Sequence, residues 1–351
     1  MLKVFRLMLS VLLLAGAASA APTTSPELGT FYFPGWHPDP FTGNRDTWAV
    51  IRPYPEREPR RGWYDDRDPT VLAAQADEMR AAGIGFVVFD WYFEQGAVQA
   101  NAPLEAYLKL KNAGPAASIL WCRHGRSPST TAAEWRRIVA AWIAYAKSER
   151  FYRIDGRPVV MVFDTGRMAR EAHEAGSTLA SWVREAQAAA RIAGMPPFHF
   201  VAGVWNGDDP TIAEAARSGF SSITSYNFSR APGDARPAEG YAARDQIYRR
   251  IWAKMADNEA HLPVLLPLTA GWDRRPWGGS ETPEVDRSQP TDAEFRTHLA
   301  AAHRLMQDKG IRRAILCCWN EYGEGSVIEP TRTGGDARLR AIREVLKRDR
   351  D

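Results

Sequence analysis

The sequence predicts an α/β protein with a single (β/α)8 TIM barrel. Eight apolar, strand-like segments alternate with helix-like segments along the 351-residue chain. The apolar runs are continuous, as in parallel strands that are buried on both faces. A doubly wound open sheet is the alternative, but no Gly-rich fingerprint follows the first strand-like segment. No linker rich in Gly, Ser and Pro interrupts the alternation, so residues 21–351 are assigned to one barrel domain.

The predicted strands are short apolar runs. In the second of them, the stretch Phe86 to Phe89 is apolar without interruption. The eight predicted strands cover residues 30–33, 84–90, 117–121, 158–163, 198–204, 222–226, 264–268 and 314–319.

Helix signals occupy the intervals between these strands. Asp68-Pro69 is typical of a cap followed by a first-turn proline, and Gly83 lies just past the predicted end. Two predicted capping boxes pair a Thr with a Glu three residues later, at 131–134 and 291–294. Four tryptophans lie on helical stripes and are expected to pack in the core, namely Trp135, Trp142, Trp182 and Trp252.

Residues 1–20 have the layout of a secretory signal peptide. Lys3 and Arg6 give a positive start, residues 7–14 are apolar, and residues 18–20 are small, as a cleavage site requires. A membrane anchor is the alternative, but the apolar run is too short to span about 30 Å of hydrocarbon. We therefore expect export to the periplasm or the cell exterior, with no stable membrane span.

Charge and cysteine content exclude several classes of function. The net charge of +3 is small and no basic stripe is visible, so nucleic acid is not an expected partner. Cys317 and Cys318 are neighbours in a predicted strand, which would point their side chains to opposite faces. Both are expected to be small core residues rather than metal ligands, and no spacing among them and Cys122 resembles a zinc site. Neither a metal nor a cofactor is predicted, and no oligomeric state follows.

Three long connections leave the carboxyl ends of predicted strands, at about 34–67, 227–239 and 269–290. Long ordered loops are usually functional, and in a TIM barrel this face carries the active site. The residues that end or follow the strands are therefore the candidates for substrate binding. They are Trp36, His37, Asp90, Trp91, Tyr92, His124, Asp164, Trp205, Asn206, Tyr226, Trp272, Asn320 and Tyr322.

This set is rich in Trp, Tyr and polar side chains, which suits a carbohydrate. Aromatic faces pack on the C–H faces of sugar rings, and acids and amides bond the hydroxyl groups. Asp90 has two interpretations of equal weight, as a ligand for a sugar hydroxyl or as a partner of Arg123. His37 either lines the sugar site or caps a turn.

The sharpest local feature is the segment 320–325, Asn-Glu-Tyr-Gly-Glu-Gly, directly after an apolar strand. Cleavage of a glycosidic bond commonly uses two carboxyl groups, one that gives a proton and one that acts as base or nucleophile. Glu321 and Glu324 are three residues apart on a turn that Gly323 and Gly325 allow to be tight. Two exposed loop acids are the alternative interpretation.

At this point the chain resembles a known family, the WbsX-like proteins, which are related to the family-99 endo-α-mannosidases and endo-α-mannanases. Four stretches carry the resemblance: 31–38 (FYFPGWHP), 62–69 (GWYD with the following Asp-Pro), 85–93 (GFVVFDWYF) and 319–330 (WNEYGEGSVIEP). They extend from the first predicted strand to the last. In this order and spacing they are specific together.

The resemblance implies a (β/α)8 barrel that acts on glycosidic bonds through the two glutamates of the last-strand motif. By this analogy Glu324 is the general acid/base at the glycosidic oxygen. Glu321 would activate the substrate's own 2-hydroxyl, which gives retention through an anhydro-sugar, without a metal. Tyr322 and Gly323 stand where the mannose-active enzymes carry Trp-His, so mannose is not implied as the substrate.

Three functions compete at this stage. The first is an exported glycoside hydrolase that acts on a poly- or oligosaccharide. The second is a polysaccharide-biosynthesis glycosyltransferase, which would need a cytoplasmic nucleotide-sugar donor that the signal peptide makes inaccessible. The third is a carbohydrate-binding barrel without catalysis, because a fold alone does not determine a function.

Overall fold

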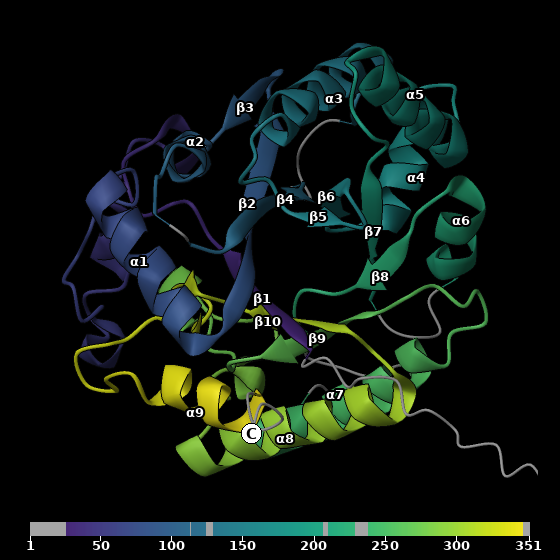
Figure 1. Ribbon diagram of the computed structural model, residues 1–351. Helices are drawn as coiled ribbons and strands as arrows, with labels where there is room; N and C mark the ends of the chain where they lie inside the picture. Colours follow the sequence, from purple (N-terminus) through teal and green to yellow (C-terminus); the bar gives the residue numbers. More distant parts are fainter. Residues whose placement is uncertain (1–25, 113, 124–128, 206–209, 229–237, 347–351) are drawn as a thin grey trace, which may run out of the picture.

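The protein is a nearly closed barrel of parallel strands surrounded by helices (Figure 1). The computed structural model describes residues 26–112, 114–123, 129–205, 210–228 and 238–346. Neighbouring strands follow the order β8-β7-β6-β4-β2-β1-β10-β9, and a parallel bridge from Ile223 to Val264 joins the two ends. The predicted fold class is therefore confirmed, and every predicted strand is present.

The barrel strands coincide with the apolar runs to within a few residues. They are β1 (Glu27–Tyr32), β2 (Ile84–Glu94), β4 (Ala116–Cys122), β6 (Arg157–Val162), β7 (His199–Gly203), β8 (Ser222–Thr224), β9 (Leu265–Thr269) and β10 (Arg313–Cys317). Short strands β3 (Ala97–Gln99) and β5 (Arg153–Ile154) pair antiparallel with β2 and β6. Strands β11 (Asn320–Glu321) and β12 (Ser326–Val327) form a separate hairpin after β10.

Alternation along each strand divides the core into two parts. Phe86 and Val88 of β2 belong to a cluster inside the barrel, whereas Val87, Phe89 and Trp91 belong to the larger cluster between strands and helices. Successive side chains of a strand point to opposite faces, so this division continues to the strand end. It decides which residues of β2 reach the mouth of the barrel.

The helices lie around the outside of the strands, with α7, α8 and α9 along one side and α3 and α5 along the other (Figure 1). They are α1 (Pro69–Ala82), α2 (Ala102–Leu108), α3 (Ala132–Ala146), α4 (Thr165–Glu174), α5 (Leu179–Ile192), α6 (Thr211–Ser218), α7 (Gly240–Ala256), α8 (Asp292–Lys309) and α9 (Ala337–Leu346). Both predicted capping boxes are formed, at the starts of α3 and α8. The four tryptophans on helical stripes are buried as predicted.

Helices α2 and α4 were not predicted from the sequence. Helix α2 is short and has no side-chain cap at Asn101. Helix α4 is mostly polar and buries only a narrow stripe that includes Met168 and Ala172. No helix within the described ranges is long and apolar enough to cross a membrane. The predicted signal peptide lies outside those ranges.

The two adjacent cysteines correct the sequence prediction. Cys317 and Cys318 are joined by a disulfide bond, so their side chains do not point to opposite faces. The reason is that β10 ends at Cys317, and strand alternation does not extend to the next residue. Both residues are fully buried and belong to the cluster inside the barrel, as small core residues would. Cys122 is a buried free thiol.

Candidate active site

A cavity of about 920 Å³ lies at the carboxyl ends of the barrel strands. Its floor comes from strand ends, and its walls come from the loops after β1 and β9. Short 3-10 turns shape those loops at Pro40–Thr42, Thr47–Val50, Pro55–Arg57, Arg275–Trp277 and Pro283–Val285. The lining residues are Phe33, Phe41, Thr42, Arg45, Asp46, Thr47, Ala49, Val50, Asp90, Tyr92, Cys122, Arg123, Phe163, Tyr226, Arg274, Pro276, Trp277, Glu321 and Glu324.

The structure brings five of the predicted site residues together in this cavity. Asp90 and Tyr92 arrive from β2, Tyr226 from the end of β8, and Glu321 and Glu324 from the hairpin after β10. The phenol of Tyr226 donates a hydrogen bond to Asp90 Oδ2 at 3.2 Å, and Tyr92 stacks on Phe41. Residues more than two hundred positions apart thus line one space.

The hairpin β11 to β12, which carries both glutamates, depends on its glycines. Glu321 pairs with Ser326 across the hairpin, and the turn runs between them. A Cβ atom at Gly323 would lie 1.6 Å from Trp277 Nε1, so any side chain there collides with the indole. Gly325 has a φ of 68° and packs against the backbone of Asp273. The expected need for glycine at both positions therefore has a steric cause.

The two glutamates have raised pKa values. Burial raises the pKa of Glu324 to about 7, although the positive charges of Arg274 and Arg244 oppose the rise. Burial also raises the pKa of Glu321 well above its usual range, and the negative charges of Glu324 and Asp90 add to this. Like charges close together resist simultaneous ionisation, so the pair titrates as a unit. Trp277 Nε1 donates to Glu321 Oε1 at a long 3.4 Å.

Asp90 extends this group of acids to three. Burial raises the pKa of its carboxyl well above the usual range, the Tyr226 hydrogen bond opposes the rise, and Glu324 adds to it. Oδ1 of Asp90 is buried and has no hydrogen-bond partner within the described part of the chain. The Arg123 guanidinium, which lines the same cavity, donates to Phe93 O at 3.0 Å and to Glu171 at 3.3 Å. Both interpretations of Asp90, as a ligand for a sugar hydroxyl or as a partner of Arg123, stay predictions.

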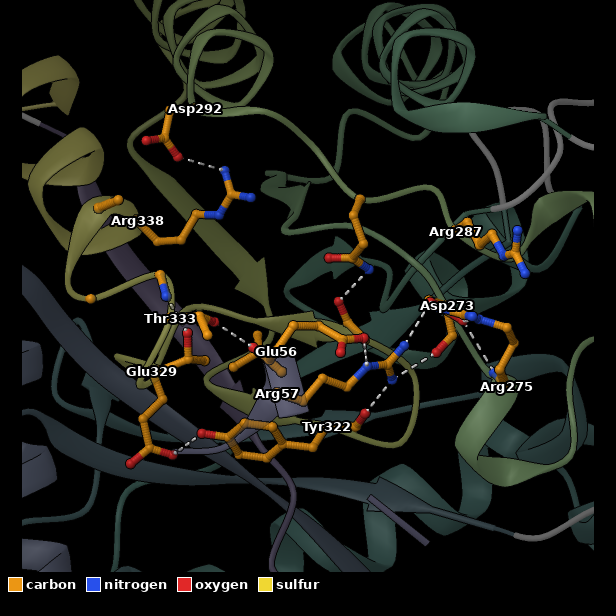
Figure 2. Close-up of a pocket in the computed structure, with 17 residues that line it drawn as sticks. Glu56, Arg57, Asp273, Arg275, Arg287, Asp292, Tyr322, Glu329, Thr333 and Arg338 are labelled. Carbon is orange, nitrogen blue, oxygen red and sulfur yellow. Dashed lines mark hydrogen bonds and ion pairs between the residues drawn. The ribbon is translucent and has the colours of Figure 1, made fainter. Parts of the chain in front are cut away.

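A second, smaller cavity of about 430 Å³ lies on the other side of the same hairpin. Figure 2 shows its lining, in which arginines and carboxylates are joined in pairs. Arg57 bonds Asp273, Arg275 bonds the same carboxylate, and Arg338 lies 3.7 Å from Asp292. None of its side chains is a predicted substrate ligand except Tyr322.

Trp91 and Asp164 were predicted to bind substrate, but they face away from the larger cavity. Trp91 alternates with Asp90 and Tyr92 and therefore packs on the helix side, with its ring 6.1 Å from that of Trp142. Asp164 caps helix α4 by accepting a hydrogen bond from Arg167 N at 2.7 Å. Strand alternation explains the first error, and an unpredicted helix explains the second.

Three further predicted residues hold the hairpin in position or belong to it, and they do not line the larger cavity. Trp36 stacks on Trp48 with ring centroids 4.0 Å apart, and its Nε1 donates to Asn320 O. The side-chain amide of Asn320 bonds the backbone of Phe33: its Oδ1 accepts from Phe33 N, and its Nδ2 donates to Phe33 O. Tyr322 is fully buried and donates to Glu329 Oε2 at 2.9 Å.

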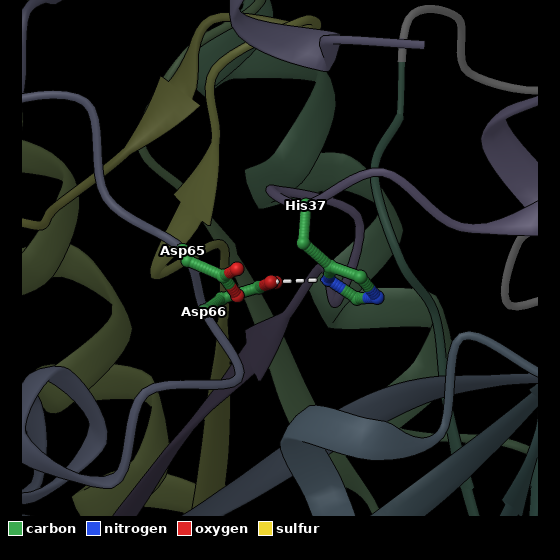
Figure 3. Close-up of side chains that lie close together, drawn as sticks. All are labelled: His37, Asp65 and Asp66. Atoms are coloured by element: carbon green, nitrogen blue, oxygen red, sulfur yellow. Dashed lines mark hydrogen bonds and ion pairs between the residues drawn. The ribbon is translucent and has the colours of Figure 1, made fainter. Parts of the chain in front are cut away.

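His37 is held in a buried pair with Asp66, as Figure 3 shows. Its Nδ1 lies 2.5 Å from Asp66 Oδ1. Burial alone would lower the pKa of His37, but the hydrogen bond and charge of Asp66 raise it overall. Asp65 lies near enough to make a three-residue group of metal-ligand type, yet both of its oxygens bond the exposed Arg67. The pair anchors the first loop to the start of α1, and His37 does not line the larger cavity.

Four predicted residues remain. Trp272 donates to Ser280 Oγ and lies under the Arg244 guanidinium, outside the cavity lining. Trp205 is 50% exposed and packs its edge on Phe163, which does line the cavity. His124 and Asn206 lie outside the described residues.

Several lining residues were missed by the sequence analysis. Phe41, Arg45, Arg274 and Trp277 come from the interiors of the two long loops rather than from strand ends. The lengths of those loops were the only signal, because a loop's interior has no periodicity to place its side chains.

Comparison with known proteins assigns the family. A family model described as Glycosyltransferase WbsX matches residues 53–342. The chain belongs to the WbsX family. Among curated proteins it is 24% identical over 381 residues to an uncharacterized protein WxcX of Xanthomonas campestris pv. campestris strain B100. The match covers 95% of this chain and 51% of the relative, so this chain spans about half the length of the curated relatives it matches.

Solved structures similar to this WbsX family member are glycoside hydrolase barrels. A glycoside hydrolase-like protein superposes with a TM-score of 0.68 at 14% identity, covering 94% of this chain and 97% of the other. A family-99 endo-α-mannosidase from Bacteroides thetaiotaomicron gives 0.62 at 16% identity, covering 93% and 98%. At these identities the likeness shows a shared fold.

Proposed function

We propose that the protein hydrolyses glycosidic bonds of a poly- or oligosaccharide, with Glu321 and Glu324 as its catalytic carboxylates. The observation that carries this proposal is that one hairpin presents both side chains to the larger cavity, at the barrel face where such sites form. Glycoside hydrolases commonly use such a pair of carboxyl groups. The family membership and the likeness to glycoside hydrolase barrels support it.

The roles follow from the pKa values and from the resemblance to family 99. A pKa of about 7 suits Glu324 as an acid/base, since such a group both gives and takes a proton at neutral pH. The raised pKa of Glu321 makes its carboxylate a stronger base than usual once its proton has left. By the resemblance to family 99, the active microstate has the proton on Glu324 and an ionised Glu321.

The proposed reaction has two steps. Glu324 gives its proton to the glycosidic oxygen as the C–O bond breaks, while Glu321 takes the proton of the sugar 2-hydroxyl, whose oxygen attacks C1. Water then opens the resulting anhydro-sugar, giving its proton to Glu324, and Glu321 returns a proton to O2. One water is consumed, both carboxyl groups recover their starting state, and the anomeric configuration is retained.

The remainder of the lining suits a sugar substrate. Phe41, Tyr92, Phe163 and Trp277 offer aromatic surface for the C–H faces of sugar rings. The unpartnered Oδ1 of Asp90 can accept a hydrogen bond from a hydroxyl group. Trp205 extends this surface toward solvent through its contact with Phe163. These features belong to binding, and the glutamates to chemistry.

We further propose that the chain is exported and that residues 1–20 are removed. The charged start, apolar run and small residues of this segment support export. Expression of the full chain in a Gram-negative host, followed by N-terminal sequencing of periplasmic protein, tests this. A mature N-terminus at Ala21 is expected, and an intact, cytoplasmic chain would contradict it.

The decisive experiment measures reducing-sugar release from a panel of α- and β-linked polysaccharides. We expect Glu324→Gln and Glu321→Gln each to lose about 10³-fold or more in kcat, because both carboxylates act in the transition state. Glu281→Gln, at an exposed position of the 269–290 loop, is the matched control. A substrate with an activated leaving group should restore Glu324→Gln in particular, since it needs no protonation.

A second candidate function is glycosyl transfer, which the family's description favours. It predicts turnover only with a nucleotide-sugar donor and an acceptor. Transfer from such a donor, without hydrolysis of any polysaccharide, would replace our proposal. Binding on a glycan array with no turnover of either kind would favour a carbohydrate-binding barrel.

A further inference from the structure

The wall that separates the two cavities contains a buried arginine. Arg57 ends the 3-10 turn in the loop after β1, and only 7% of its surface is exposed. Figure 2 shows its guanidinium between the hairpin carrying the glutamates and the loop after β9. It therefore touches loops that follow three neighbouring strands, β1, β9 and β10.

The contacts of Arg57 converge on backbone groups next to the glutamates. Its Nη1 donates to Tyr322 O at 2.6 Å and to Asp273 O at 3.0 Å. Its Nη2 lies 2.7 Å from Asp273 Oδ2. Asp273 N in turn donates to Glu324 O at 2.6 Å. One planar guanidinium thus holds the residue after Glu321 directly, and Glu324 through Asp273.

Within the described residues, few other hydrogen bonds hold the hairpin on the side of the smaller cavity. Gln289 Nε2 donates to Gly325 O at 2.7 Å, beyond Glu324. The side chain of Tyr322 bonds Glu329, and its carbonyl group accepts from Arg57 at 2.6 Å and more weakly from Gly325 N at 3.3 Å. Removing the guanidinium would leave two buried carbonyl oxygens without this donor, and the turn could relax toward the smaller cavity. A carboxylate displaced by about 1 Å can lose about 10²-fold in rate.

We propose that Arg57, acting with Asp273, is a positioning residue that fixes the carboxylates of Glu321 and Glu324 for catalysis. The catalytic part rests on the proposed glycoside hydrolase function. The geometric part does not, because it concerns the order of the hairpin in the protein without substrate. Arg57 itself faces the smaller cavity and does not line the larger one.

The test compares Arg57→Ala and Arg57→Lys with Arg338→Ala. Arg338 is a matched control because it lines the same smaller cavity and also bonds backbone, donating to Pro290 O at 2.5 Å, without touching the hairpin. Hydrogen exchange measured by mass spectrometry reports on the hairpin without any substrate. We expect peptides covering 319–327 and 271–277 to exchange at least tenfold faster in Arg57→Ala, and not in Arg338→Ala.

Kinetics provide the second readout, on whichever polysaccharide the wild type cleaves. Arg57→Ala should lower kcat by about 10- to 100-fold with KM within about threefold, because the binding surfaces are untouched. Arg57→Lys, which keeps the charge but not the two-pronged geometry, should fall in between. Added guanidinium ion should partly restore Arg57→Ala, since the smaller cavity is wide enough to admit it.

The outcomes separate the two proposals. Unchanged exchange at 319–327 in a folded Arg57→Ala protein overturns the positioning role, whether or not the wild type is active. If Glu324→Gln abolishes turnover while Arg57→Ala keeps it, the hydrolase proposal stands and the positioning role fails. Should Arg57→Ala not fold, Asp273→Asn, which keeps the shape but weakens the pair, is measured in the same way.

Discussion

The acids on the two sides of the hairpin β11–β12 differ in which charges lie next to them. Toward the larger cavity, Asp90, Glu321 and Glu324 crowd together, and the pKa values of all three are raised. Toward the smaller cavity, burial alone would raise the pKa of Asp273, but Arg275 and Arg57 hold it below its usual range. Burial raises the pKa in every case. For Asp273 the two bonded arginines lower it by more than burial raises it, whereas Glu329, also beside the smaller cavity and paired with Arg61, keeps a raised pKa.

The two kinds of carboxyl group therefore suit different roles, one structural and one chemical. A paired carboxylate such as Asp273 stays ionised and holds loops together, whereas a crowded carboxyl group can exchange a proton near neutral pH. The hairpin carries Glu321 and Glu324, and Asp273 in the loop after β9 donates a backbone hydrogen bond to it. Under the proposed function, the placement of the glutamates depends on the Arg57–Asp273 pair behind the hairpin.

The largest expected effect comes from adding a side chain at position 323, which would push the hairpin away from Trp277 in the wall of the larger cavity. In Gly323→Ala, a Cβ atom would overlap the indole of Trp277, so either the hairpin or the loop after β9 must move. We expect kcat/KM to fall by about 100-fold and the unfolding free energy by about 1–3 kcal/mol.

Gly85→Ala is the control for this change. A Cβ atom at Gly85 meets no atom closer than 3.5 Å. Parallel rate and urea-unfolding measurements on the two variants decide the point, and equal activity in both would show that the hairpin tolerates displacement.

The second prediction concerns stability. Because the folded pKa of Glu324 is raised from 4.5 to about 7, wild-type stability declines as the pH rises between these values. Glu324→Gln has no such charge to bury. It should match wild type near pH 4.5 and exceed it by about 2 kcal/mol at pH 8, allowing for coupling to Glu321. Urea unfolding at both pH values, with Glu281→Gln alongside, tests this, and a pH-independent difference would contradict it.

The smallest expected effect is a shift in the pH profile of activity. It is tested on two neighbouring arginines, Arg274 beside the larger cavity and Arg275 beside the smaller one. Arg274 holds down the pKa of Glu324, so Arg274→Gln should raise it and move the alkaline limb of kcat/KM upward by about one pH unit. Activity above pH 7 would rise relative to wild type, since the acid keeps its proton longer. Arg275→Gln, whose side chain bonds Asp273 instead, should leave the limb in place. Equal shifts in both variants would show a general charge effect.

Sequence reasoning reached most of the fold but only part of the site. The barrel strands were predicted because strands buried on both faces leave continuous apolar runs, and the capping boxes marked α3 and α8. Helices α2 and α4 were missed because α2 has no side-chain cap and α4 has few apolar residues. Asp164 was consequently assigned to substrate rather than to the cap of α4.

Within the site, position after a strand was a reliable guide only when side-chain direction was also known. Asp90, Tyr92 and Tyr226 line the larger cavity, whereas Trp91, between two of them, faces the helices. Trp36 and Asn320 also follow strands, yet their side chains bond backbone groups and do not line the larger cavity. Trp36 donates to Asn320 O, and Asn320 donates to Phe33 O. Spacing places a residue along a strand, while the packing of neighbouring loops decides what it touches.

By itself, the sequence determined the barrel and a glycine-containing turn that carries the two glutamates after the last strand. These features are local: apolar runs, caps and turn residues act over a few positions of the chain. The tertiary structure alone decided that Trp277 bears on Gly323, that Asp90 lies unpaired beside the glutamates, and that Arg57 reaches across to the hairpin. Those contacts join residues up to 265 positions apart, and only closure of the barrel brings their loops into one place.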